Sequence, residues 1–186
     1  MKLLNSIKLS LLPILALPII LSSCQKLDSL IKVNIPLQMA DVSFTIPATS
    51  GTTVSTGATI EFNVDSAIQA NNASFTAANI KSVIVDSVIV NLTNATAGNS
   101  FSNVSSFSAS VSSNTDATQV VFAQANNNTT GVVSTLKLIP TSNVDLVYYF
   151  NSTSFTYAFN ATLVTPTTID LTADATIYYH AVVSPD

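Results

Sequence analysis

Hydrophobic and polar residues alternate in short runs along most of the chain, and this period of two is typical of half-buried β-strands. Val42, Phe44 and Ile46 alternate with Ser43 and Thr45 near the start of the series. The same alternation returns near the end, where one face carries Phe155, Tyr157, Phe159 and Ala161, and then Ile169, Leu171, Ala173, Ala175 and Ile177. These runs predict strands with one face in a core.

One run, KSVIVDSVIVNLTN over 81–94, has apolar residues at both odd and even positions, which point to opposite faces of a strand. Its apolar positions divide between the two faces as Val83, Val85 and Ile89 against Ile84, Val88 and Val90. Apolar residues on both faces indicate a central strand that is covered on both sides. Asp86 interrupts this run, and we expect it to lie at a strand edge or to form a local hydrogen bond.

Segments without alternation separate the strands. SGTTVSTG at 50–57 reads as a turn, and NNNTTG at 126–131 reads as a hairpin connection in which Gly131 takes a positive φ. In the stretch 65–80, Asp65 is expected to cap a short helix and Thr76 to begin another turn. About eight strands and one or two short helical turns remain. We therefore expect an all-β fold, an antiparallel β-sandwich that is immunoglobulin-like or similar.

The N-terminal segment has a different pattern. Lys2 and Lys8 precede an apolar run from Leu11 to Leu21, which is about half as long as the ~20 residues of a membrane-spanning helix. Pro13 and Pro18 also disfavour a continuous helix there. A charged start, a short apolar core and small residues after it predict a signal peptide over 1–23.

The signal peptide ends in LSSC at 21–24, which resembles the lipobox of bacterial lipoproteins. The resemblance implies that the thiol of Cys24 carries a diacylglycerol, that the chain is cut before Cys24, and that the new amino terminus is acylated, for example with palmitate. Each buried CH₂ contributes roughly 0.8 kcal/mol, so two or three acyl chains anchor a protein firmly. Residues 24–30 then form the lipidated cysteine and a tether, and residues 31–186 form a single β-sandwich domain.

Two further short patterns resemble signals of Bacteroidetes lipoproteins. CQKLD at 24–28 is similar to their surface-export signal, which implies the outer membrane, with the cell surface favoured over the periplasmic face. The triplets DSL, DSA and DSV resemble their O-glycosylation sequon, which implies glycans on Ser29, Ser66 and Ser87. Ser87 lies in the central strand and is expected to be buried. The β-rich body also looks like the small lipoproteins of that phylum.

Charge excludes one class of partner. Charged residues make up 9% of the chain, and Ser, Thr and Asn make up 65 of 186 residues. After Cys24 there are ten acidic residues against four lysines and no arginine, a side-chain charge of −6. Nucleic-acid binding needs Lys and Arg at phosphates, so the composition excludes it. Contact with the membrane is expected through the N-terminal lipid.

The mature chain has few side chains of the kinds that act in catalysis. Cys24 is the only cysteine, so lipidation leaves no thiol for a disulfide, a metal or a nucleophile, and His180 is the only histidine. Four carboxylates are candidate calcium ligands but do not form a calcium-loop motif: Asp41, Asp145, Asp170 and Asp174. Nothing places Glu61 near Asp86 as a glycosidase pair. We therefore expect no enzyme activity, no catalytic residue, no cofactor and no metal.

Aromatic side chains are the remaining candidates for a ligand site. Tyr178 and Tyr179 are adjacent in a strand and point to opposite faces, so at least one is expected to face solvent and a ligand. The leading hypothesis is a non-enzymatic structural or interaction module at the cell surface. The alternative is a glycan- or ligand-binding accessory lipoprotein of an outer-membrane uptake complex.

Overall fold

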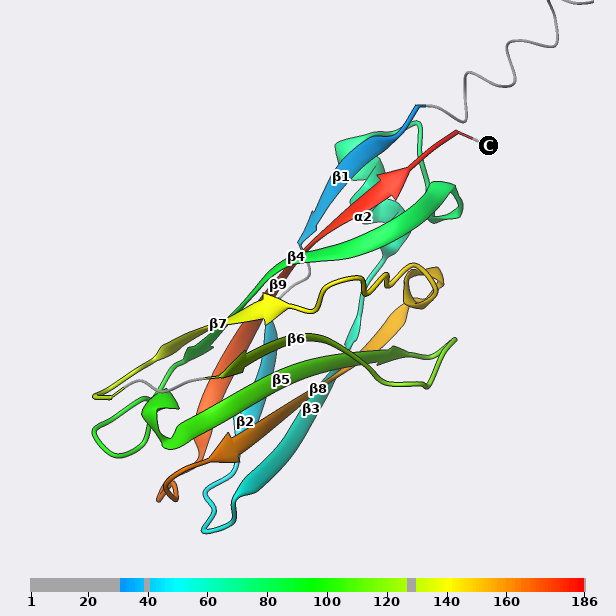
Figure 1. Ribbon diagram of the computed structural model, residues 1–186. Helices are drawn as coiled ribbons and strands as arrows, with labels where there is room; N and C mark the ends of the chain where they lie inside the picture. The colour runs from blue at the N-terminus through cyan, green and yellow to red at the C-terminus, as the bar shows by residue number, and fades with distance from the viewer. Residues whose placement is uncertain (1–30, 39–40, 127–129, 186) are drawn as a thin grey trace, which may run out of the picture.

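The computed structural model describes residues 31–38, 41–126 and 130–185. These residues form an antiparallel sheet that curls over on itself, so that its two halves face each other (Figure 1). The strands are β1 (Val33–Gln38), β2 (Val42–Ile46), β3 (Thr53–Glu61), β4 (Ile80–Leu92), β5 (Val104–Ser113), β6 (Val120–Asn126), β7 (Thr135–Pro140), β8 (Ser154–Leu163) and β9 (Leu171–Val183). The expected antiparallel all-β fold is confirmed, with nine strands where the sequence indicated about eight.

The strand order is β1-β9-β4-β7-β6-β5-β8-β3, and β2 pairs with β9 beside β1. Strand β7 connects the two halves. It pairs with β4 over Thr135–Leu138 and with β6 only at Ile139 and Pro140. The predicted hairpin between β6 and β7 is therefore open near its connection, although Gly131 has the expected positive φ of 89°.

The core lies between the two halves of the sheet. On β9 every second residue from Leu171 to Val183 is buried, as the alternation predicts. The ring of Phe44 on β2 stacks on Phe159 on β8 at a centroid distance of 4.0 Å. The hydroxyls of Tyr157 on β8 and Tyr179 on β9 lie 3.1 Å apart in the core and form a hydrogen bond. These two pairs of rings join the halves through their side chains.

Strand β4 departs from the regular alternation that the sequence indicates. Its pairing with β9 shifts register between Val85 and Ser87, which makes Asp86 the extra residue of a β-bulge. The buried positions are Ile80, Val83 and Val85 before the bulge and Val88, Val90 and Leu92 after it. The predicted grouping of Ile89 with Val83 and Val85 is therefore wrong, because the bulge moves the buried face by one residue.

Two local predictions are corrected. Residues 53–57, which we read as part of a turn, begin β3, where Val54 is buried. Helix α2 (Val64–Asn71) is capped by Asn63 rather than by Asp65, because the Asn63 side chain accepts the N–H of Ser66 at 2.8 Å. The turn predicted at Thr76 is confirmed as the 3₁₀ helix η1 (Ala77–Asn79). Two further 3₁₀ turns are η2 (Phe101–Asn103) and η3 (Tyr149–Asn151).

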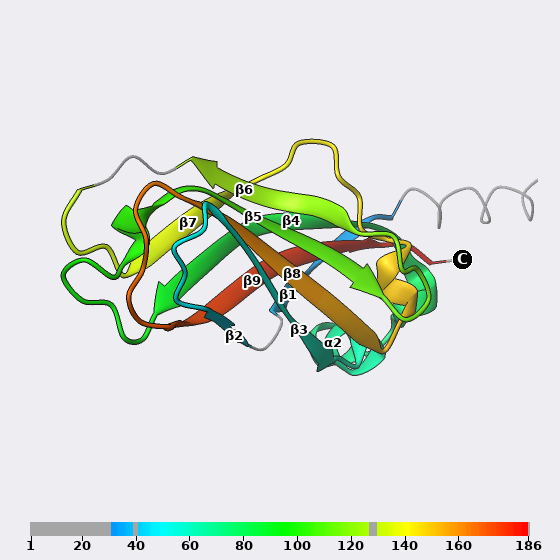
Figure 2. The ribbon, with the colours of Figure 1, turned by 90° about the horizontal axis from the view of Figure 1, so that it is seen from below.

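The two ends of the molecule differ in structure. The start of β1, the end of β9, α2 and η1 gather at one end (Figures 1 and 2). Three connections gather at the opposite end, namely 47–52 between β2 and β3, 93–103 between β4 and β5, and 164–170 between β8 and β9. We call these three connections together the loop end.

Candidate functional site

Asn103 is the central residue of the loop end. It is buried at the end of η2, and its Nδ2 donates toward the carbonyl of Gly98 at 3.0 Å, the hydroxyl of Thr165 at 2.9 Å and the carbonyl of Pro166 at 3.2 Å. Its Oδ1 accepts the N–H of Ser100 at 3.0 Å. One amide thus joins the 93–103 connection to the 164–170 connection, which satisfies polar groups that would otherwise be buried without partners.

Asn99 makes a second link between the same connections. Its Oδ1 accepts the N–H of Thr168 at 2.7 Å, and its Nδ2 donates to the Thr168 hydroxyl at 3.0 Å. Asp170 extends the network to the third connection, because its Oδ1 accepts the N–H of Ala48 at 2.7 Å and its carbonyl accepts Nδ2 of Asn94 at 2.8 Å. The loop end is therefore fixed by side-chain hydrogen bonds between residues far apart in the sequence.

Three apolar side chains remain exposed on or beside this network. Val132 is 58% exposed, Val164 63% and Ile169 39%. Val132 precedes Val133, which lies beside η2 because the N–H of Phe101 donates to the carbonyl of Val133 at 2.9 Å. Fixed loops with exposed apolar side chains lose little conformational entropy when a partner binds. This arrangement is suited to recognition.

A second cluster lies on the outer face of β4 and β9. Nδ1 of His180 is 2.6 Å from Oδ1 of Asp86, with side chains 31% and 49% exposed. A carboxylate only accepts hydrogen bonds, so Nδ1 carries a proton, and in the neutral form of the ring Nε2 is an acceptor. The bulge turns Asp86 outward toward this ring. Asp86 was expected at a strand edge or in a local hydrogen bond, and both expectations are wrong: it lies on β4 inside the sheet and bonds to His180, 94 positions away on β9.

The two candidate tyrosines lie in different environments. Tyr178 is partly exposed on the outer face, two residues from His180. Tyr179 is buried, and its hydroxyl bonds to Tyr157 inside the core. Tyr179 is therefore excluded as a ligand-facing side chain, and Tyr178 alone meets the expectation that at least one of the two faces solvent. Burial raises the pKa of the Tyr179 phenol well above its ordinary value.

The predicted modification sites are only partly within the described residues. Cys24 and Ser29 lie outside them. Ser66 is exposed in the first turn of α2. Ser87 is half-buried rather than buried, because the bulge at Asp86 brings it to the outer face beside Tyr178. Of the two described serines, Ser66 is the more accessible to a modifying enzyme.

The candidate calcium ligands each accept a hydrogen bond from a different group. Asp145 accepts the N–H of Val83 at 2.8 Å, Asp174 accepts the hydroxyl of Ser43 at 2.6 Å, and Asp41 accepts the hydroxyl of Thr176. Within residues 31–38, 41–126 and 130–185, no three His, Cys, Asp or Glu side chains gather as a metal site. Glu61 and Asp86 lie on strands of different halves of the sheet.

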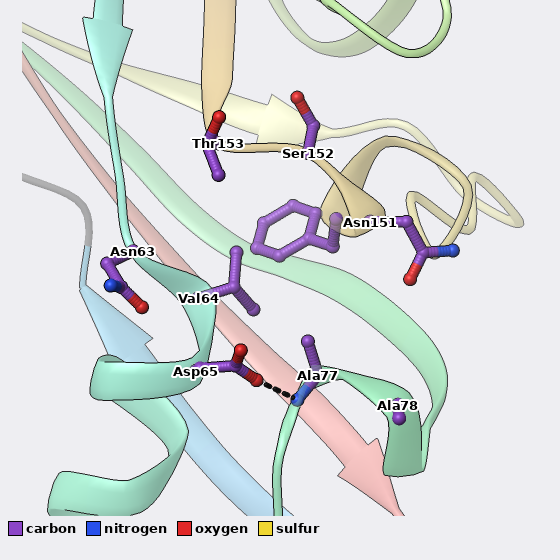
Figure 3. A pocket seen from close by; sticks show the side chains of 9 residues that line it. Asn63, Val64, Asp65, Ala77, Ala78, Asn151, Ser152 and Thr153 are labelled. Atoms are coloured by element: carbon purple, nitrogen blue, oxygen red, sulfur yellow. Dashed lines mark hydrogen bonds between the residues drawn. The ribbon is translucent and has the colours of Figure 1, made fainter.

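Two hollows open to solvent lie on the described surface. One of about 320 Å³ lies between α2, η1 and η3 (Figure 3). Asp65, at its rim, accepts the N–H of Ala77 at 2.6 Å and so holds η1 against α2. Another, of about 430 Å³, lies where β6 and β7 separate and is lined by 124–126 and 139–142. Most of the side chains around these hollows are amides, hydroxyls and apolar groups.

Sequence reasoning missed the asparagine network. Asn99 and Asn103 lie between two runs of alternating residues, and their partners in the 164–170 connection lie more than 60 positions away in the chain. The sequence signal was the spacing of Ser100 and Asn103, since a hydroxyl followed three residues later by an amide forms a capping box.

No protein-family model matches the chain, and no curated protein matches it. In the part of the chain that the structure describes, no helix has the length and apolar character needed to span a membrane.

Proposed function

We propose that this protein is a lipid-anchored, non-enzymatic interaction module of the outer membrane that presents its loop end to a protein or glycan partner at the cell surface. The observation that carries this proposal is the position of the loop end. It lies opposite the end where the chain enters β1, and β1 begins at Val33, nine residues after Cys24. An anchor at Cys24 therefore holds the loop end away from the membrane.

The length of the tether supports this orientation. Nine fully extended residues span about 30 Å, so the start of β1 can lie no farther than this from the lipid on Cys24. The end with α2 and η1 thus stays near the lipid. The loop end is the part of the domain that a partner in solution or on another surface reaches first.

The chemistry of the two clusters supports recognition rather than catalysis. The loop end presents hydroxyls, amides and the side chains of Val132, Val164 and Ile169. His180 and Asp86 form a pair on an outer sheet face, and neither lines the two hollows described above. A catalytic triad consists of such an Asp–His pair together with a nucleophile that is bonded to the histidine, and the pair here is described with Asp86 alone.

The experiment is a fractionation of cells that express the wild-type chain or Cys24→Ala. The proposal predicts that the wild type is found in the outer membrane and is removed by protease added to intact cells. Cys24→Ala should remain unprocessed and lose its outer-membrane position. A Cys24→Ala chain that is processed and localised like the wild type would contradict the anchor.

The loop end is tested separately with a photo-reactive residue in place of Val164, and in place of Asn34 on β1 as the matched control. Both positions are exposed, but they lie at opposite ends. A discrete cross-linked product at 164 and none at 34 is expected. Equal products at both positions would contradict a role for the loop end.

Glycan binding at the outer face is the second candidate, and the exposed part of Tyr178 beside His180 and Asp86 favours it. A sugar ring stacks on an aromatic face, while the carboxylate and Nε2 accept its hydroxyl hydrogens. Tyr178→Ala is expected to abolish binding on a glycan array, and Tyr148→Ala, at an exposed site on the β7–β8 connection, to leave it unchanged. Equal signals from both variants would exclude this site.

A further inference from the structure

Among residues 31–38, 41–126 and 130–185, strand β3 ends the strand order and has a backbone partner on one side only. It pairs with β8 in an unbroken register from Thr53 opposite Thr162 to Glu61 opposite Ser154. Strand β2 precedes it in the chain but forms its ladder with β9. The other side of β3 is therefore a sheet edge of nine residues without a bulge.

The hydrogen bonds at the two ends of β3 show which residues face this edge. The N–H of Leu163 donates to the carbonyl of Thr52 at 2.8 Å, and the N–H of Phe62 donates to the carbonyl of Thr153 at 2.9 Å. Both residues on the β3 side have even numbers. Because antiparallel bonding alternates, the N–H and C=O groups that point to the free edge belong to the odd-numbered residues: Thr53, Ser55, Gly57, Thr59 and Glu61.

The edge at β1 is protected, whereas the edge at β3 is not. Pro36 in β1 has no N–H, and its carbonyl accepts Nδ2 of Asn71 from α2 at 3.4 Å. A proline and a covering helix are common ways of blocking an edge strand. Strand β3, with the sequence TVSTGATIE, has no proline, no lysine and one charged residue, Glu61.

We propose that β3 pairs antiparallel with β3 of a second copy of this chain, about a two-fold axis at Gly57. In this register Ser55 lies opposite Thr59 of the second copy, and Thr53 lies opposite Glu61. Both pairs join odd-numbered residues, so their free N–H and C=O groups meet. A symmetric interface requires this reciprocity, in which each residue of a pair contacts the other in both copies.

The side chains of β3 are self-complementary in this register. On the inner face Val54, which is buried, lies opposite the half-buried Ile60. On the outer face the hydroxyl pair of Thr59 and Thr156, 2.9 Å apart, continues to Ser55 of the second copy. The two Glu61 carboxylates are eight residues apart along the strand, about 27 Å, so they do not repel each other strongly.

This inference rests on the proposed function in one respect, because lipid anchoring would concentrate copies of the chain at one membrane surface, where they can pair. The pairing itself is a property of β3. It is therefore measured on the full chain in detergent and on the full-length Cys24→Ala chain, so that a failed anchor and a failed pairing give different results.

Sedimentation velocity of the wild type, Thr59→Pro, Ser55→Lys and Gln124→Lys tests the edge. Proline at 59 removes an N–H that points to the free side and leaves the backbone hydrogen bonds to β8 intact, although the hydroxyl contact with Thr156 is lost. Gln124→Lys adds the same charge at an exposed site on β6. The wild type and Gln124→Lys should be dimers, and the two edge variants should dissociate at least tenfold more readily with unchanged circular dichroism. A monomeric wild type, or dimeric edge variants, would overturn the proposal.

Cysteine pairs test the register in the Cys24→Ala chain. Residues opposite each other in a hydrogen-bonded pair have Cα atoms about 5.5 Å apart, within the range that a disulfide spans. Ser55→Cys with Thr59→Cys should give a disulfide-linked dimer on oxidation. Ser55→Cys alone should not, because the two copies of residue 55 are about 14 Å apart along the strand. Equal cross-linking of both variants would overturn the register.

Discussion

His180 and Asp86 are 94 positions apart in the chain, yet their side chains lie 2.6 Å apart on the outer face of β4 and β9. The bulge in β4 turns the side chain of Asp86 toward solvent, and this brings its carboxylate beside His180 on the adjacent strand. The pair places the only histidine of the chain in a fixed orientation.

Because both side chains are partly exposed, solvent screens this pair and its contribution to stability is small. A double-mutant cycle with Asp86→Ala and His180→Ala should give a coupling free energy of about 0–1 kcal/mol, measured by urea denaturation. A coupling free energy far above that range would show that the pair is more strongly desolvated than its exposure indicates.

Asn103→Asp should destabilise the protein by about 2 kcal/mol or more, because it replaces a donor with an acceptor opposite the carbonyls of Gly98 and Pro166. Asn34→Asp, at an exposed site on β1, is the matched control and should change the free energy of unfolding by less than about 0.5 kcal/mol. Equal effects from the two substitutions would contradict the role given to the asparagine network.

Phe44→Ala should cost about 3–5 kcal/mol of unfolding free energy, since it removes a buried ring that stacks on Phe159 across the core. Ile139→Ala removes an exposed side chain on β7 and should cost less than about 0.5 kcal/mol. Denaturant titration of both variants measures the difference. A small loss for Phe44→Ala would mean that β2 contributes little to closing the core.

Alkaline pH should destabilise the fold through Tyr157 and Tyr179. Burial raises the pKa of both phenols, so the folded protein retains protons that the unfolded chain releases near pH 10. The stabilisation is complete below pH 10 and is lost as the pH rises above it, at up to about 1.4 kcal/mol per pH unit for each tyrosine. The slope should decrease in Tyr157→Phe/Tyr179→Phe. An unchanged slope in that variant would contradict this assignment.

Local alternation predicted the strands that face the core, such as β8 and β9, because burial on one face requires a period of two. It did not predict the bulge at Asp86. That irregularity depends on how β4 pairs with β9, and β9 lies about 90 positions away. The strand at Thr53–Gly57 was misread as a turn because its small polar residues are typical of turns. Its pairing with β8 gives it an extended structure.

The candidate site was less predictable than the fold. The opposite-face argument separated Tyr178 from Tyr179 but did not say which one is buried, because that depends on which side of β9 faces the second half of the sheet. Asn103 acts through contacts with 165–166, and its own neighbours in sequence do not reveal them.

The proposed lipid anchor at Cys24 is measured by the mass of the N-terminal peptide of the mature protein. Protein purified from the membrane should begin at Cys24 and carry a diacylglycerol on its thiol, with an acylated amino terminus. A mature chain that retains residues 1–23, or one in which Cys24 is unmodified, would rule out the anchor.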